Sequence, residues 1–95
     1  MYTVFVAENS AYMDRSAERR LGDFPAWDEA VAAARDVVER SLRELHAPPM
    51  DAEHLFRLYT LFGEDAYVVP SGEPRRFSAW DYARERSRQI CRSPS

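Results

Sequence analysis

Side chains that could bind a ligand through oxygen atoms lie in predicted loops and at the ends of predicted elements. They are Asn9, Tyr12, Asp14, Glu64, Asp65 and Asp81, here called the acidic set. If the loop after the first strand meets the start of the third strand, these groups could converge on a small molecule or a hard cation. Their spacing matches no EF-hand, and helix capping and solvation account for each acid separately. We therefore expect no metal ion and no cofactor, and keep the acidic set as a candidate ligand or partner site.

Arginine is concentrated toward the C-terminus. Positions 67–95 contain six arginines and three acids and carry a net charge of +3, whereas positions 1–66 carry −6 and the whole chain −3. Five of these arginines form a basic set of candidate phosphate contacts: Arg75, Arg76, Arg84, Arg88 and Arg92. The last three are spaced by four and share one helix face. Nucleic-acid binding is thus an alternative function, although the net acidic charge and the absence of RNP, helix-turn-helix and zinc motifs argue against it.

Catalytic and membrane functions find little support in the sequence. The single Cys91 excludes an internal disulfide, and His46 and His54 match no metal motif. No nucleophile can be paired with a base, so an enzyme is the least favoured class. The apolar runs are far shorter than the ~20 residues of a membrane span, and no secretory signal is visible, so we expect a cytoplasmic protein. All 13 basic residues are arginine, which indicates a GC-rich bacterial source.

Hydrophobic periodicity predicts six elements in the order β-β-α-α-β-α. We expect strands at residues 2–7, 15–21 and 66–69, and helices at residues 26–46, 52–62 and 79–91. The charges of the second strand suit a sheet edge. Asp51 and Ser78 are placed to cap the second and third helices. Gly63 is expected to end the second helix as its C′ residue, a position that favours a left-handed backbone.

These elements predict a single α+β domain over residues 1–92, followed by a frayed tail at residues 93–95. The simplest packing is a three-stranded, mainly antiparallel sheet in the order 2-1-3, with the helices mostly on one face. The first strand is apolar on both faces, with Val4 and Val6 on one and Phe5 on the other. Three helices cannot easily cover both faces, so the second face should pair with another copy, unless the last helix crosses to it. The sequence therefore favours a non-enzymatic protein-interaction or regulatory module that forms a homodimer.

Several short motifs resemble a family of small, uncharacterised bacterial proteins. The resemblance covers nearly the whole chain and rests on Asn9-x-x-Tyr12-Met13-Asp14, Gly22-x-Phe24, Phe62-Gly63-Glu64-Asp65 and Trp80-Asp81-Tyr82-Ala83. It implies no activity, cofactor or partner. One departure is Ala26, which stands where the family pattern has a hydroxyl residue, so the first helix should lack a side-chain cap at a cost of about 1 kcal/mol.

Overall fold

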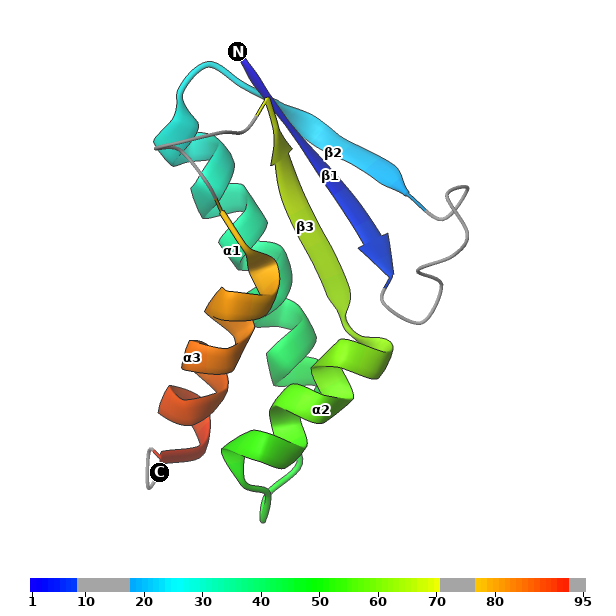
Figure 1. Ribbon diagram of the computed structural model, residues 1–95, viewed down its shortest axis with the longest axis vertical. Coiled ribbons are helices and arrows are strands. Elements are labelled where there is room, and N and C mark those ends of the chain that lie inside the picture. The colour runs from blue at the N-terminus through cyan, green and yellow to red at the C-terminus, as the bar shows by residue number, and fades with distance from the viewer. Residues whose placement is uncertain (9–17, 71–76, 93–95) are drawn as a thin grey trace.

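The fold is built on a three-stranded antiparallel sheet with β1 at its centre (Figure 1). The computed structural model describes residues 1–8, 18–70 and 77–92. Its elements are β1 (Tyr2–Glu8), β2 (Arg19–Phe24), α1 (Trp27–Leu45), α2 (Ala52–Phe62), β3 (Glu64–Val69) and α3 (Ala79–Arg92). The strand order is β2-β1-β3, and both neighbours run antiparallel to β1. The predicted α+β class, element order and strand order are confirmed.

Two clusters of buried side chains form the core, and α1 joins them. The first lies between the sheet and α1 and contains Val4, Val6, Ala30, Ala34, Val37, Ala66 and Val68. The second lies among the three helices and contains Val38, Leu42, Leu55, Tyr59, Ala79 and Ala83. Thus α1 covers the sheet, whereas α2 and α3 pack mainly on α1 and on each other (Figure 1). The molecule is accordingly elongated, 41 × 28 × 20 Å. None of the described helices has the length and apolar character needed to span a membrane.

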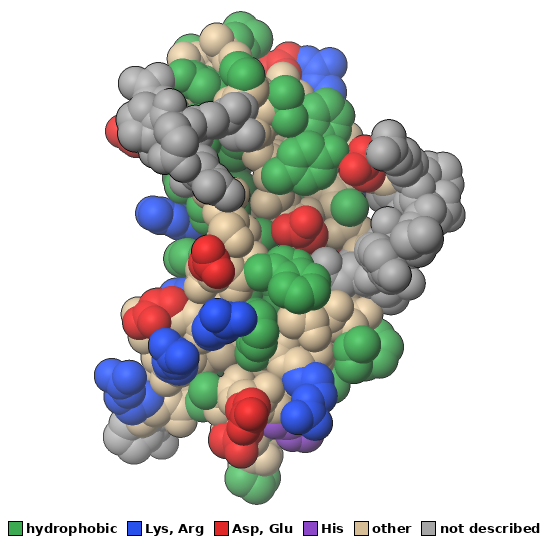
Figure 2. Space-filling model, viewed as in Figure 1, with side chains coloured by type: hydrophobic (Ala, Val, Ile, Leu, Met, Phe, Trp, Pro, Cys, Tyr) green, Lys and Arg blue, Asp and Glu red, His purple; other side chains and the backbone are tan. Residues whose placement is uncertain are grey.

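The helices leave one face of the sheet, here called the open face, without a helical layer. Strand side chains alternate between faces, so Phe5 points away from the fully buried Val4 and Val6. Tyr67 is opposite Phe5 in the β1–β3 register, and their rings stack with centroids 5.5 Å apart. In the view of Figure 2, hydrophobic side chains are exposed over the strands. The last helix does not cross to the open face, because it packs against α1 and α2.

The second strand lies later in the chain than the sequence predicts. Residues 15–17 lie outside the described part of the chain, and β2 extends to Phe24 instead of ending at Leu21. The sequence predicts that Gly22 ends the strand, yet it pairs with Val4 of β1. The strand continues because the side chain of Phe24 packs against the first core cluster. The register shifts between Val4 and Phe5, so Leu21 is an extra residue in β2, as in a β-bulge.

The helix starts follow the predicted caps. The Asp51 carboxylate accepts a hydrogen bond of 2.8 Å from the backbone N–H of His54. Ser78 Oγ accepts one of 3.2 Å from the backbone N–H of Asp81. At the start of α1, Ala26 forms no side-chain cap, as its residue type predicts.

Gly63 follows the last residue of α2, as predicted, but without the left-handed backbone that is common at this position. Its φ of −79° and ψ of −179° are extended values that any residue adopts. The need for glycine is steric instead, because a Cβ atom at this position would lie 2.9 Å from Cε1 of Tyr59 and closer still to its Cδ1. Tyr59 is fully buried, and its carbonyl oxygen accepts the hydrogen bond from Gly63 N–H at the turn from α2 into β3.

Candidate functional site

The structure separates the members of the acidic set that it describes. Asn9, Tyr12 and Asp14 lie outside the described residues. The sequence predicts that Glu64 and Asp65 are solvated residues past the end of the second helix. They belong to β3 instead, because this strand begins two residues earlier than predicted. Asp81 lies in the first turn of α3. Among residues 1–8, 18–70 and 77–92, no three His, Cys, Asp or Glu side chains are grouped so that they could hold a metal ion.

Glu64 is held at the junction between α2, β3 and α1. Its backbone N–H donates to Ser41 Oγ at 3.0 Å, and its carbonyl accepts from the Tyr59 hydroxyl at 2.9 Å. Its carboxylate forms an ion pair of 2.6 Å with Arg19. The side chain also lines a shallow cleft of about 310 Å³ together with Glu8 and Glu44, two residues that the sequence did not single out. Because its carboxylate is paired with Arg19 and its backbone bonds to Ser41 and Tyr59, Glu64 has a structural role at this junction.

Asp65 is half-buried, and its carboxyl group has an altered acidity. Desolvation by burial raises the pKa of Asp65, and a hydrogen bond from the backbone N–H of Ala66 opposes this only in part. It is opposite Ala7 in the register, so it lies on the open face with Phe5 and Tyr67. Ionisation of Asp65 therefore costs more in the folded state than in the unfolded chain.

Replacing Asp65 by asparagine should stabilise the protein at neutral pH. Since the folded-state pKa is raised, the stability present below the unfolded pKa is lost as the pH rises through the folded pKa. We expect Asp65→Asn to raise Tm by a few degrees at pH 7 and to leave it unchanged near pH 3, measured by circular dichroism. Glu64→Gln, which loses an ion pair, should show no gain. A lower Tm for Asp65→Asn at pH 7 would show that the carboxylate has a stabilising partner.

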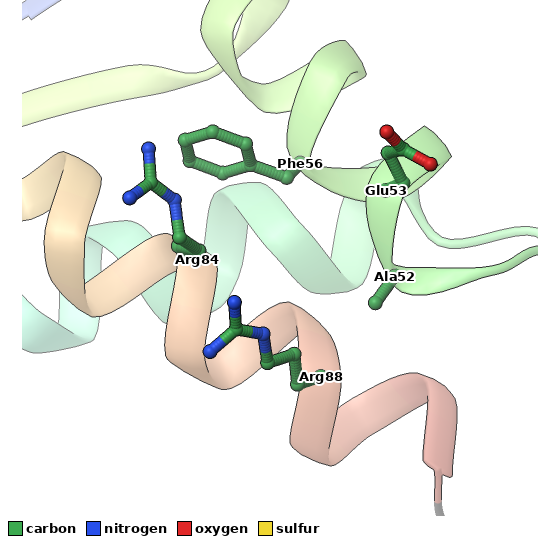
Figure 3. Close-up of a pocket in the computed structure, with 5 residues that line it drawn as sticks. All are labelled: Ala52, Glu53, Phe56, Arg84 and Arg88. Carbon is green, nitrogen blue, oxygen red and sulfur yellow. The ribbon is translucent and has the colours of Figure 1, made fainter.

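The structure brings two members of the basic set together. Arg75 and Arg76 lie outside the described residues, and Arg92 is the last residue of α3. Arg84 and Arg88 line one cleft of about 430 Å³ between α3 and the first turns of α2 (Figure 3). The other lining residues are Ala52, Glu53 and Phe56. In Figure 2, arginine side chains gather over α3.

An ion-pair network that sequence reasoning missed joins α1 to α3. Glu39 accepts hydrogen bonds from the Arg86 guanidinium through both carboxylate oxygens and from the Tyr82 hydroxyl at 2.9 Å. Arg43 lies 3.4 Å from the same carboxylate. The Arg86 hydrogen bond, more than the Tyr82 one, holds the pKa of Glu39 below its usual value against the opposing effect of burial. The i,i+4 pairs Glu39/Arg43 and Tyr82/Arg86 are visible in the sequence, but nothing in it indicates that they face each other.

The lone thiol is not activated. Burial raises the pKa of Cys91, and the negative charge of Asp51 adds to the effect. Desolvation is the main cause of this shift. A thiol with a raised pKa is a poor nucleophile at neutral pH.

No protein-family model matches this chain, and neither the curated proteins nor the solved structures include one that is significantly similar to it. Interpretation of its function therefore depends on its own surfaces.

Proposed function

We propose that the protein is a non-enzymatic interaction module that acts as a homodimer through its open face. The observation that carries this proposal is the Phe5–Tyr67 stack on a sheet face that no described helix covers. Both side chains are half-buried in a single copy, and aromatic side chains are enriched at protein interfaces. The same face includes Val69, whose side chain follows Tyr67 by two residues and is 43% exposed.

The geometry of the open face is compatible with a second copy as the partner. Arg20, opposite Phe5 on the β2 edge, is neutralised by an ion pair with Asp23 of the same strand. A two-fold axis parallel to the strands would place β2 of one copy over β3 of the other. Two-fold dimers are the commonest assemblies and present the same patch twice.

Pairing two open faces must offset the entropic cost of association. Burying ~600 Å² of apolar surface contributes roughly 15 kcal/mol at ~25 cal/mol per Å². The loss of translational and rotational freedom costs about 4–15 kcal/mol. The balance favours a dimer of moderate affinity.

Nucleic-acid binding is less well supported. Within α3, the guanidinium of Arg86 is engaged by Glu39, that of Arg84 lies 5.1 Å from the Phe56 ring centroid, and that of Arg88 lies near Glu85. Arg86 is thus unavailable to phosphate, and the exposed Arg84 and Arg88 share their cleft with the carboxylate of Glu53, which disfavours a polyanion.

Light scattering coupled to gel filtration, at a protein concentration of ~50 μM, tests the dimer. We expect a dimeric species with twice the 11.0 kDa mass of one chain. Phe5→Glu should elute as a monomer, because it places a charge at the centre of the buried face, and its far-UV circular dichroism spectrum should match that of the wild type.

Leu61→Arg is the matched control, since Leu61 is a 51% exposed apolar residue on α2. This variant should remain dimeric. A monomeric wild type would overturn the proposal, and so would a folded Phe5→Glu variant that still forms the dimer.

A further inference from the structure

The cleft between α2 and α3 has the size and lining of a small-molecule site. Its volume of about 430 Å³ lies within the range of ligand pockets. It is lined on one side by two arginines of α3 and on the other by Ala52, Glu53 and Phe56 of α2 (Figure 3). It lies among the helices, so its occupancy is independent of the proposed dimer.

Both arginines keep hydrogen-bond donors available to a ligand. Arg84 and Arg88 are one helical turn apart, and Figure 3 shows the Arg84 guanidinium beside the Phe56 ring and the Arg88 guanidinium below it along α3. No carboxylate in the described ranges forms an ion pair with Arg84, whose charge lies over the Phe56 ring. Arg88 is 3.6 Å from Glu85, but both side chains are 58% exposed, and such a pair is weak. Two adjacent guanidinium groups, each with paired N–H donors, match the geometry of a carboxylate.

The α2 side of the cleft is apolar and firmly supported. Phe56 stacks with the buried Tyr59 at 6.4 Å and meets Trp80 edge-on at 6.3 Å. Because the Arg84 guanidinium lies over this ring, the apolar contact left to a flat ligand group is the part of Phe56 that lines the cleft, together with Ala52. Glu53 adds one negative charge to the lining, which disfavours ligands with several negative charges. The lining therefore favours a ligand that has one anionic group attached to a flat apolar ring.

We propose that this cleft binds a small aromatic carboxylate, with the carboxylate held by Arg84 and Arg88 and the ring packed against Phe56 and Ala52. Neither guanidinium is indispensable to the fold, because both side chains are exposed. The site can therefore be altered without unfolding the protein.

Titration of the ¹⁵N-labelled protein with 2-naphthoate, followed by NMR, tests this site. We expect saturable shifts in α2 and α3, with a dissociation constant on the order of 0.1–1 mM for a ligand of this size. The neutral 2-naphthamide should bind about tenfold more weakly because it lacks the charge. Acetate, which lacks the ring, should give no saturation below ~10 mM.

Three variants separate the site from general charge attraction. Arg84→Gln and Arg88→Gln should each weaken 2-naphthoate binding about tenfold. Arg92→Gln removes the same charge from the same helix outside the cleft and should leave binding unchanged. Equal losses in all three variants would overturn the proposal, as would equal binding of the amide or the absence of any shift at ~5 mM 2-naphthoate. Saturable binding of inorganic phosphate tighter than that of 2-naphthoate would also contradict it.

Discussion

Replacing Gly63 by alanine is expected to lower the free energy of unfolding by about 3 kcal/mol, the upper part of the range for overpacked sites. The added Cβ would lie 2.9 Å from both Cε1 and the carbonyl oxygen of Tyr59, and closer still to Cδ1. None of these atoms can move easily, because the Tyr59 ring is fully buried and its carbonyl accepts the hydrogen bond that ends α2. In thermal denaturation this corresponds to a fall in Tm of roughly 15 °C for a domain of this size.

Gly22→Ala is the matched control for Gly63. At Gly22 the added Cβ would meet only the Phe24 ring, at an ordinary contact distance of 3.7 Å. Its effect should be within about 1 kcal/mol. Combining Gly63→Ala with Tyr59→Leu should cost less than the sum of the two changes, because the smaller side chain relieves the clash. Additive losses, or a Gly63→Ala variant as stable as wild type, would contradict the steric explanation.

Replacing Glu39 by alanine should cost about 2–3 kcal/mol at pH 7, since hydrogen bonds to charged groups contribute about 1.5–3 kcal/mol. The change removes the acceptor of Arg86 and of Tyr82 and leaves the guanidinium, 25% exposed, without its carboxylate. The contact between α1 and α3 weakens as a result. Chemical denaturation with urea measures the loss as a shift in midpoint at constant slope.

The effect of Glu39 should depend on pH with a definite sign. Because its pKa is lowered in the folded state, Glu39 stabilises the fold above its unfolded pKa, and this stability is lost as the pH falls through the folded pKa. The difference between wild type and Glu39→Ala should therefore shrink between pH 7 and the acid range.

Asp36→Ala provides the comparison for Glu39 on the same helix. Asp36 pairs with Arg40 at 2.6 Å, but the two side chains are 58% and 73% exposed. This change should cost less than about 0.5 kcal/mol at any pH. Equal losses for the two variants would mean that the Glu39 network does not join the helices.

The sequence predicted most of the architecture, because periodicity and capping act over short stretches of chain. The apolar residues on both faces of β1 placed it at the centre of the sheet, and the apolar stripe of residues 26–46 predicted the long helix, although only the structure shows that this helix is the one that covers the sheet. Asp51, Ser78 and Ala26 behave at the helix starts as their residue types predict.

Boundaries that depend on distant contacts were predicted wrongly. Phe24 extends β2 because its ring reaches the core, and Glu64 joins β3 because it pairs with Glu8 of β1 and donates its backbone N–H to Ser41. No local pattern indicates either event, since the deciding partner lies far away in the sequence.

The candidate sites also combine features that the local sequence predicts with features that only tertiary contacts decide. The sequence alone placed Arg84 and Arg88 on one helix face, because residues four apart in a helix are neighbours. Only the tertiary structure decided that Phe56 and Ala52 of another helix complete a cleft around them, and that Arg86, between them in sequence, is bound to Glu39 instead. Side chains on one helix are related by the fixed helical repeat, whereas the meeting of two helices depends on the packing of the whole core.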